Sequence, residues 1–128
     1  MKSFILSRIQ SFRFAFSGWW HVIRTQRNAW IHALVSLAVL AVSVWLRISR
    51  IELAVILLTI AMVWTAEFLN TALEAVVDLA SPSKHHLAKI GKDVGAAGVL
   101  IAAGASVLVG LLILGPPLWR VLQSWLVR

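Results

Sequence analysis

Over the first 24 residues, apolar and polar side chains recur with the period of a helix. Apolar residues recur at intervals of three and four, at Ile5, Ile9, Phe12, Phe16, Trp19 and Ile23. A polar stripe follows the same spacing, at Gln10, Arg13, Ser17, His21 and Arg24. This pattern predicts an amphipathic helix over residues 1–24 that lies in the membrane–water interface. The alternative, a helix packed on a soluble core, fits the apolar sequence that follows less well. Because Arg8 and Arg13 interrupt any apolar core, no signal peptide is expected.

Three further apolar segments are each long enough to cross a bilayer. The first is an uncharged run over residues 28–46, and its 19 residues suffice for about 30 Å of hydrocarbon. A short polar turn is predicted at 47–52, and a second helix over about 53–79. The third is an uncharged run over 94–114. The pattern therefore predicts an all-helical, integral membrane protein with three transmembrane helices, forming one domain over residues 1–128.

Prolines mark the predicted ends of the second and third helices. Pro82 follows the second, and proline ends a helix because it lacks the amide hydrogen and its ring clashes with the preceding turn. Gly115, Pro116 and Pro117 are expected to stop the third helix in the same way. A separate, short interfacial helix is then predicted over residues 119–127.

Lysine and arginine are divided unequally between the two sides of the predicted spans. Eight share one side: Lys2, Arg8, Arg13, Arg24, Arg27, Lys84, Lys89 and Lys92. Four lie on the other: Arg47, Arg50, Arg120 and Arg128. Basic residues accumulate on the cytoplasmic side of membrane proteins. The N-terminus and the second loop are therefore predicted to be cytoplasmic.

Composition supports the membrane assignment and narrows the partners. Hydrophobic residues make up 60% of the chain and charged residues 13%, against about 45–50% and about 25% in soluble domains. The net charge of +7 suits either nucleic acid or an anionic membrane surface. Hydrophobicity and seven tryptophans favour the membrane, so no nucleic-acid partner is expected. The absence of cysteine excludes disulfides and thiolate chemistry.

The clearest candidate chemistry lies in the last turns of the second predicted helix. Helical spacing places five polar residues on one face: Glu67, Asn70, Thr71, Glu74 and Asp78. Inserting an acid at the centre of a membrane helix costs about 2.5–3.5 kcal/mol. A stripe of acids is therefore expected to have interaction partners or a function. The alternative is an interhelical hydrogen-bond network, which threonine or asparagine would form at lower cost.

A basic segment leads into the third span on the same predicted side. Lys89, Lys92, Asp93 and Ala96 follow helical spacing. Lysines beside carboxylates suit a polyphosphate bridged by Mg²⁺, because the metal binds carboxylate and phosphate oxygens together and lysine neutralises the remaining charge. The alternative is that the lysines bind lipid headgroups and set the topology. That alternative suits Lys84 and explains Lys92 beside Asp93 poorly.

Two familiar kinds of site are not supported. His85 and His86 are weak evidence for zinc, because they are adjacent and no cysteine or His-Glu-x-x-His frame accompanies them. They are instead expected to be exposed loop residues. The chain also has no Walker-type glycine loop and no protein-kinase motif set.

Small residues are concentrated around the start of the third span. They are Gly91, Gly95, Ala96, Ala97, Gly98, Ala102, Ala103 and Gly104. Such residues let membrane helices approach closely, and a glycine at 91 or 95 would also admit a nucleotide near the backbone. A single chain with three spans has too little surface to enclose a polar site. A homo-oligomer in contact through small-residue faces is therefore predicted.

The acidic stripe belongs to a segment that resembles a known signature. Residues 67–78 read Glu-Phe-Leu-Asn-Thr-Ala-Leu-Glu-Ala-Val-Val-Asp, which resembles the signature of the prokaryotic diacylglycerol kinase family. The family has a second conserved block, and this chain resembles it at Ala88-Lys89, Lys92-Asp93 and Ala96-Ala97. Arg27-Asn28 and Ile31-His32 resemble the start of the first span in the undecaprenol kinase branch. The resemblance covers about residues 24–105. It implies an integral membrane kinase with three spans and a surface helix, assembled as a homotrimer with active sites shared between subunits.

The resemblance also implies roles for the matching positions. Glu67 would be the general base on the lipid hydroxyl, and Asn70 would lie near the reacting γ-phosphate. Glu74 would bind the Mg²⁺ that bridges the ATP phosphates. The other nucleotide-binding positions would be Asp78, His86, Lys89, Lys92 and Asp93. The lipid-binding positions would be Asn28, Trp30 and Ala97.

The sequence departs from the family pattern at two positions. Leu79 follows Asp78, where the family often has arginine. Gln26 stands where many members carry a metal-binding glutamate. An amide oxygen can coordinate a metal but adds no charge, so Gln26 is a second, weaker metal-ligand candidate.

The sequence thus predicts an ATP-dependent lipid kinase that uses Mg²⁺. It would transfer the γ-phosphate of ATP to diacylglycerol, giving phosphatidic acid, or to undecaprenol, giving undecaprenyl phosphate. The pattern from Asn28 to His32 leans toward undecaprenol. A small proton-coupled transporter with Glu67 or Glu74 as its relay is the alternative from another class. A purely structural membrane subunit is the third interpretation. A transporter would leave Lys92 and Asp93 without a task.

Overall fold

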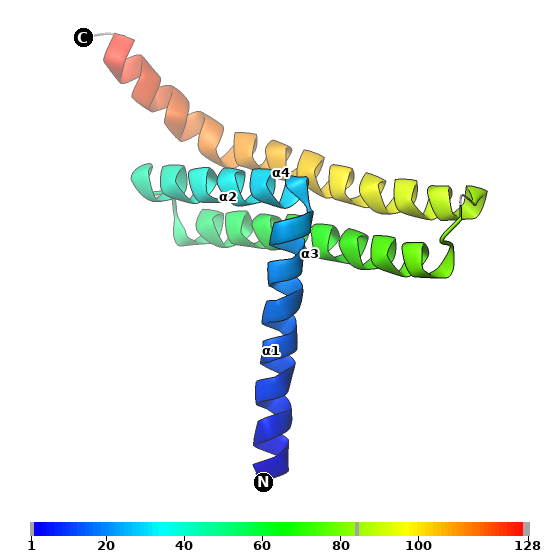
Figure 1. Cartoon of the computed structure of the whole chain (residues 1–128). Coiled ribbons are helices and arrows are strands. Elements are labelled where there is room, and N and C mark those ends of the chain that lie inside the picture. The colour runs from blue at the N-terminus through cyan, green and yellow to red at the C-terminus, as the bar shows by residue number, and fades with distance from the viewer. Residues whose placement is uncertain (1, 84, 127–128) are drawn as a thin grey trace.

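The chain folds into four helices in the computed structural model, which describes residues 2–83 and 85–126 (Figure 1). They are α1 (Lys2–Thr25), α2 (Arg27–Trp45), α3 (Arg50–Ala80) and α4 (His86–Leu126). By length and composition α2, α3 and α4 can each cross a membrane. The prediction of an all-helical protein with three apolar spans is therefore confirmed. Lys84, Val127 and Arg128, which were used in the sequence interpretation, lie outside the described residues.

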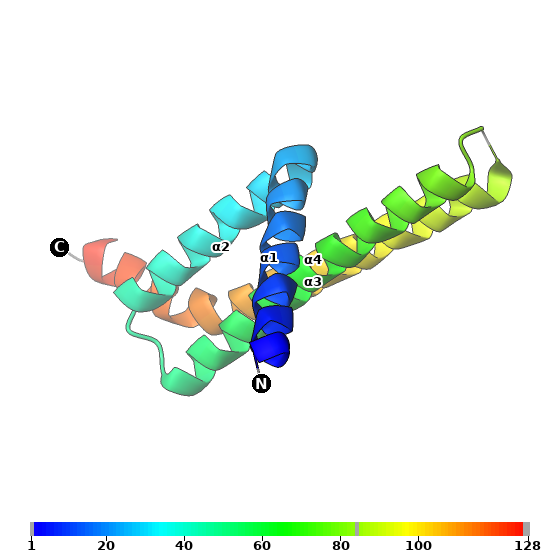
Figure 2. The ribbon, with the colours of Figure 1, turned by 60° about the horizontal axis from the view of Figure 1, so that its bottom comes forward.

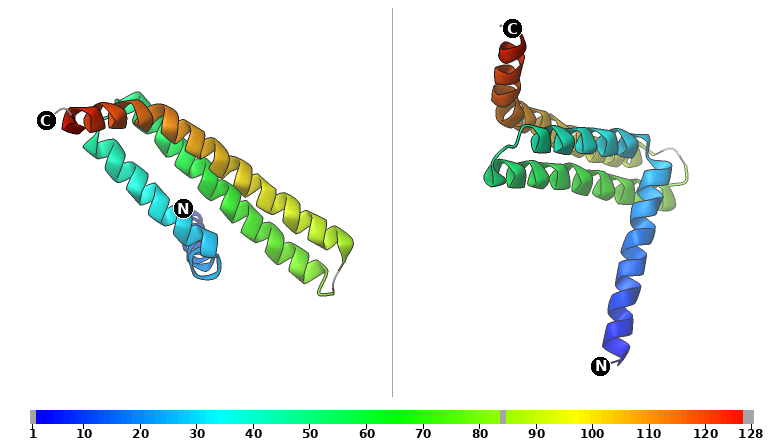
Figure 3. Two further views of the ribbon diagram at one scale, coloured as in Figure 1. Left: turned by 90° about the horizontal axis from the view of Figure 1, so that it is seen from above. Right: turned by 90° about the vertical axis from the view of Figure 1, so that its left-hand side faces the viewer.

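The three spans form a bundle, and α1 leaves it sideways. α3 and α4 form a hairpin and pack side by side along most of its length, while α2 lies against α3 (Figures 1 and 3). The end of the hairpin, where α3 ends and α4 begins, extends beyond the start of α2 (Figure 2). α1 runs crosswise to the bundle and, within the described residues, contacts α2 and α3 but not α4. This arrangement brings the α1–α2 corner against the middle of α3.

A single extended residue makes the corner between α1 and α2. Gln26 has φ −100° and ψ 116°, and its backbone amide still donates to the carbonyl of Val22 at 2.9 Å. The corner is buried at Val22, Ile23 and Ala29, and two aromatic side chains from α3 pack against it. These are Trp64 and Phe68, and Trp64 also stacks on Trp19 with 5.7 Å between ring centroids. Aromatic packing therefore sets where Gln26 meets α3.

The rest of α1 exposes its apolar face. Phe12 and Phe16 are 68% and 73% exposed in the single chain. This is the surface that a helix lying in a membrane interface presents to the acyl chains. Ile5 belongs to the predicted apolar stripe, but the described side chains begin after it.

The second span begins earlier than the sequence interpretation placed it. Residues up to Glu52 were predicted to form a polar turn, whereas α3 begins at Arg50. The cause is a capping box. The Ser49 hydroxyl accepts from the Glu52 amide at 3.3 Å, and the Glu52 carboxylate accepts from the Ser49 amide at 2.7 Å. This reciprocal pair satisfies two amides at the start of the helix, so the first turn forms immediately after the connection.

The third span does not stop at the two prolines, so that prediction was wrong. α4 is continuous from His86 to Leu126 with Pro116 and Pro117 inside it, and no separate tail helix forms within the described residues. The C-terminal part of α4 turns away from α3 (Figure 1). Proline bends a helix without ending it when the lost hydrogen bonds fall at the bend. The tail is therefore a bent continuation of the span.

Candidate functional site

A polar cavity of about 540 Å³ lies where the α1–α2 corner, α3 and α4 meet. Its polar lining consists of Gln26, Asn28, His32, Glu67, Asn70, Glu74 and Asp93. Three separate segments of the chain thus contribute to one cavity. The structure brings together the predicted base, the predicted metal ligands and one predicted nucleotide contact. Ala97 and Asn28, two of the three predicted lipid contacts, also line it.

Glu67 is the most deeply buried acid of the site. It is 1% exposed, and the Thr71 hydroxyl donates to its backbone carbonyl at 2.9 Å. Its carboxylate atom Oε2 lies 3.8 Å from His32 Nε2. Among the described residues, neither of these two atoms has a hydrogen-bond partner. A buried acid held in a structural network would be fully hydrogen-bonded, so the network alternative does not account for Glu67.

Glu74 stands at the centre of a small cluster of carboxamide side chains. Gln26 Nε2 donates to Glu74 Oε2 at 3.3 Å, and Asn70 Nδ2 donates to Glu74 Oε1 at 3.1 Å. The first of these bonds joins the α1–α2 corner to α3. Asn70 Oδ1 is buried and has no partner in the described part of the chain. Carboxylate and amide oxygens are the side-chain ligands that Mg²⁺ accepts, and this cluster offers both.

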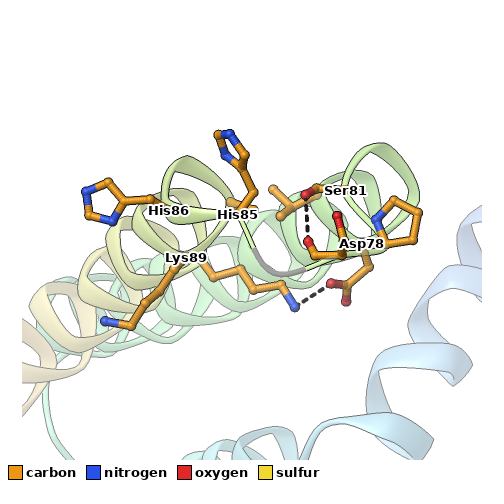
Figure 4. Close-up of a pocket in the computed structure, with 10 residues that line it drawn as sticks. Asp78, Ser81, His85, His86 and Lys89 are labelled. Carbon is orange, nitrogen blue, oxygen red and sulfur yellow. Dashed lines mark hydrogen bonds and ion pairs between the residues drawn. The ribbon is translucent and has the colours of Figure 1, made fainter.

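A second cavity, the hairpin cavity, lies at the connection between α3 and α4 (Figure 4). Its volume is about 600 Å³. Its charged and polar lining consists of Asp78, Ser81, Ser83, His85, His86, Lys89 and Lys92. Four predicted nucleotide-binding residues therefore share this cavity. Asp93, which was also predicted to bind the nucleotide, follows Lys92 directly on α4 and lines the polar cavity, so the two cavities adjoin along that helix.

The ion pairs of the hairpin cavity leave its cations accessible. Lys92 Nζ lies 2.6 Å from Asp78 Oδ1 and bridges α4 to α3. Lys89 Nζ lies 3.3 Å from Asp93 Oδ2, one turn along the same helix. Both lysines remain partly or largely exposed. Exposed pairs of this kind stabilise the fold by at most about 1 kcal/mol, so an incoming phosphate can displace a carboxylate from them.

The two adjacent histidines differ in position. His85 lies before α4, and its Nδ1 accepts a hydrogen bond from the Leu87 amide at 3.2 Å. It thus satisfies one amide at the start of α4. His86 was expected in the loop but is the first residue of α4. In Figure 4 both side chains extend from the α4 end of the hairpin cavity.

One predicted site residue lies away from both cavities, and one polar residue that lines the polar cavity was not predicted from the sequence. Trp30 is 64% exposed and lines neither cavity, so the structure does not bring it to the site. His32 was not among the predicted site residues, yet it faces Glu67. The signal was present, because an ionisable residue inside an apolar span is a candidate functional residue.

Gly95 allows α4 to approach the site closely. A Cβ atom at this position would lie 2.5 Å from Asn70 Oδ1 and 3.0 Å from Leu73 Cδ2. Replacing Gly95 by alanine is therefore expected to displace the Asn70 amide from Glu74. Misplacement of a reacting constellation by such a shift lowers turnover by about 10- to 100-fold. Turnover at saturating substrates, in the kinase reaction that the sequence predicts, measures the effect.

Gly98 provides the matched control for this change. It lies on the same helix, and a Cβ atom there would meet nothing within 4 Å. Gly98→Ala should leave turnover within about twofold, because alanine favours a helix over glycine and no contact within the chain changes. Equal losses in the two variants would show that any added methyl group on α4 impairs the enzyme, and that the contact with Asn70 is not special.

Comparison with known proteins gives one consistent family. Residues 13–114 match the family described as prokaryotic diacylglycerol kinase. A diacylglycerol kinase of Synechocystis sp. is 48% identical over 109 residues, which are 84% of this chain and 62% of the relative. An undecaprenol kinase of Bacillus subtilis is 41% identical over 109 residues, covering 85% and 89%. A diacylglycerol kinase of Escherichia coli is 32% identical over 95 residues, covering 69% and 78%.

These matches cover the parts of the chain that form the site. The matched region contains the α1–α2 corner, all of α3 and the start of α4. The chain spans about three fifths of the Synechocystis relative and most of the other two. The relatives are named as lipid kinases, which leaves the transporter and structural-subunit interpretations without support. By this match and by the three apolar spans, the chain belongs to the prokaryotic diacylglycerol kinase family, a family of multi-pass membrane lipid kinases.

Proposed function

We propose that this member of the lipid kinase family moves the γ-phosphate of ATP onto the hydroxyl of diacylglycerol or undecaprenol, with Glu67 as the general base. The observation that carries the proposal is the buried Glu67 carboxylate, whose Oε2 has no hydrogen-bond partner among the described residues, and which lines a polar cavity. A carboxylate in this state is available to accept a proton from a substrate.

The reaction needs little beyond positioning and charge. The hydroxyl proton goes to Glu67, the hydroxyl oxygen bonds to the γ-phosphorus, and the bond to the β-phosphate oxygen breaks to release ADP. Asn70, one turn further along α3, would orient the transferred group through its amide. Phosphoryl transfer requires mainly alignment and neutralisation of the phosphate oxygens.

The residues around Glu74 suit Mg²⁺. The metal would neutralise the ATP phosphates and polarise the γ-phosphoryl group when bound. Glu74 would hold it, with the amide oxygens of Gln26 and Asn70 nearby. Within the described residues no group of three or more His, Cys, Asp or Glu side chains could hold a metal on its own. Phosphate oxygens would therefore supply the remaining ligands, which is the usual way that proteins bind Mg²⁺ with ATP.

The hairpin cavity would take the nucleotide. Lys92 and Lys89 would pair with phosphate oxygens, and His86 would line the nucleotide region with Asp78. The ion pair between Lys92 and Asp78 would open as phosphate replaces the carboxylate. Asp93 would contact the nucleotide from the polar-cavity side. The hairpin extends beyond the start of α2, which supports access for a water-soluble nucleotide (Figure 2).

The proposed assembly is a homotrimer in a bacterial inner membrane, with its N-terminus and active site cytoplasmic. The distribution of basic residues supports this orientation. Neither cavity is enclosed in the single chain, which supports a neighbouring subunit closing them. Crosslinking in mild detergent should return trimers, whereas a preparation that is fully active and only monomeric would contradict the assembly.

A labelled-phosphate assay tests the proposed activity and the acceptor together. Purified protein in lipid vesicles would receive γ-labelled ATP with Mg²⁺ and either diacylglycerol or undecaprenol. Label in phosphatidic acid or in undecaprenyl phosphate identifies the acceptor. Chelation of Mg²⁺ should stop the transfer. No labelled lipid with either acceptor, from protein that binds ATP, would contradict the proposal.

A further inference from the structure

His32 lies where the polar cavity meets an apolar one. The apolar cavity has a volume of about 300 Å³ and runs between α2, α3 and α4, where it is lined mainly by aliphatic side chains such as Val39, Ile56 and Leu111. His32 is the one described residue that lines both cavities. A lipid alcohol is itself an apolar chain that ends in a polar group. The hydroxyl of such a lipid is therefore expected to lie at the boundary between the polar cavity and the apolar cavity.

The atoms at this boundary are prepared for a small polar group. His32 Nε2 and Glu67 Oε2 are both buried, both lack a hydrogen-bond partner in the described part of the chain, and lie 3.8 Å apart. This separation is too long for a direct hydrogen bond. If the two side chains part slightly to admit an oxygen atom, that atom can lie about 2.8 Å from each, which is the usual hydrogen-bond length. Buried polar atoms of this kind are rarely left unpaired unless a ligand completes them.

We propose that His32 is a catalytic residue that holds the acceptor hydroxyl together with Glu67. The His32 Nε2–H donates to the hydroxyl oxygen, and the hydroxyl donates its proton to Glu67 Oε2. The inference rests on the proposed function, because it assigns Glu67 the role of base. The lipid chain then extends from His32 into the apolar cavity.

The proposed contact aligns the nucleophile without changing the proton balance. In the reaction the hydroxyl proton moves to Glu67, the new bond joins the hydroxyl oxygen to the γ-phosphorus, and ADP leaves. His32 keeps its own proton throughout. With one lone pair of the oxygen on His32 and the O–H bond directed to Glu67, the other lone pair is free for attack. The residue therefore contributes orientation.

Aromatic packing holds the imidazole in place. The Trp64 ring meets His32 edge-on, with 6.4 Å between the centroids. Trp64 is itself fixed, because its Nε1 donates to the Ser36 hydroxyl at 3.3 Å and its ring stacks on Trp19. The same tryptophan anchors the α1–α2 corner. His32 is thus positioned by the packing that builds the site.

Two substitutions distinguish the effect of the hydrogen-bond donor from the effect of side-chain shape. His32→Leu removes the donor and keeps an apolar side chain of similar size. His32→Gln keeps an N–H donor near the position of Nε2. His32→Leu should lower kcat/KM for the lipid by about 10- to 100-fold, the value of a hydrogen bond to a reacting group, with the KM for ATP unchanged. His32→Gln should recover most of that loss.

A binding measurement without ATP tests the contact directly. The probes are the lipid alcohol that accepts label and the same lipid with hydrogen in place of the hydroxyl, both competed against a fluorescent lipid in vesicles. Wild-type protein should prefer the alcohol by about 10-fold or more, and His32→Leu should lose most of this preference, because only the hydrogen bond to Glu67 then remains. Ser43→Ala is the control, because Ser43 is a buried polar residue of α2 that donates only to the Val39 carbonyl, at 2.7 Å.

The outcomes distinguish this inference from the proposed function. If His32→Leu kept the wild-type preference for the alcohol while Glu67→Gln abolished transfer, the assignment of His32 would be overturned and the function would stand. If Glu67→Gln stayed active, the base would be wrong, whatever the binding results. Should His32→Leu fail to fold, a His32→Gln variant with lost alcohol preference would overturn the inference.

Discussion

Replacing Glu67 by glutamine is expected to lower turnover by about 10²–10⁴-fold, the usual contribution of a general base. The amide keeps the size of the side chain but cannot take the hydroxyl proton. ATP binding should be largely retained, because Glu67 lies in the polar cavity and the hairpin cavity is formed by other residues. Turnover with γ-labelled ATP, together with nucleotide binding measured separately, checks both parts.

Glu52→Gln is the matched control for this prediction. Glu52 is the acid at the other end of α3, where its carboxylate accepts from the Ser49 amide. A glutamine there can still accept that hydrogen bond, so turnover should be nearly unchanged. Near-normal turnover of Glu67→Gln would remove Glu67 from the role of base. Another group would then have to take the proton.

Replacing Glu74 by glutamine is expected to abolish activity through the metal. The cluster around Glu74 contains one carboxylate and two amides, so the substitution would leave Mg²⁺ without a charged protein ligand there. Hard cations prefer charged oxygen ligands. Wild-type protein should already require a high Mg²⁺ concentration, because Gln26 adds no charge, while phosphate oxygens sustain activity once ATP is bound. A Mg²⁺ titration at saturating ATP measures both effects.

Gln26→Glu should act in the opposite direction and lower the Mg²⁺ concentration for half-maximal rate. The new carboxylate would face Glu74 at the position where Gln26 Nε2 is now 3.3 Å away. Two carboxylates this close repel each other unless a cation lies between them. Asn28→Asp is the control, because it adds the same charge to the same cavity at a residue with no hydrogen bond to Glu74 in the structure. An unchanged midpoint in Gln26→Glu, with Glu74→Gln still active, would place the metal elsewhere.

The fold was predictable where local patterns are strong. Uninterrupted apolar runs identified the three spans, and the two stripes of the N-terminal segment identified α1. The ends of helices were harder. The turn before α3 was misjudged because the capping box of Ser49 and Glu52 overrides the polarity of the segment. The continuity of α4 through Pro116 and Pro117 was missed because proline was taken as a stop rather than a bend.

The site was predictable along α3 and much less so across the bundle. Helical spacing alone placed Glu67, Asn70 and Glu74 on one face, and the structure brings all three to one cavity. The position of His32 opposite Glu67 depends on how α2 meets α3, which is set by the packing of Trp64 and its neighbours. No short-range pattern encodes such contacts. Trp30, two positions earlier, shows the consequence, because it faces away from both cavities.

The crosswise course of α1 has a consequence for how the rate should depend on the lipid. If α2, α3 and α4 span the bilayer, as their length and composition allow, α1 would lie along its surface, because it runs crosswise to them (Figure 1). Gln26 directly follows α1 and lines the polar cavity, so the cavity would lie near that surface. The proposed acceptor would therefore meet the enzyme by diffusing within one leaflet, at one depth. Its effective concentration is a mole fraction of the bilayer and not an amount per volume of solution. Added inert lipid will slow the enzyme as an inhibitor would, although it occupies no site.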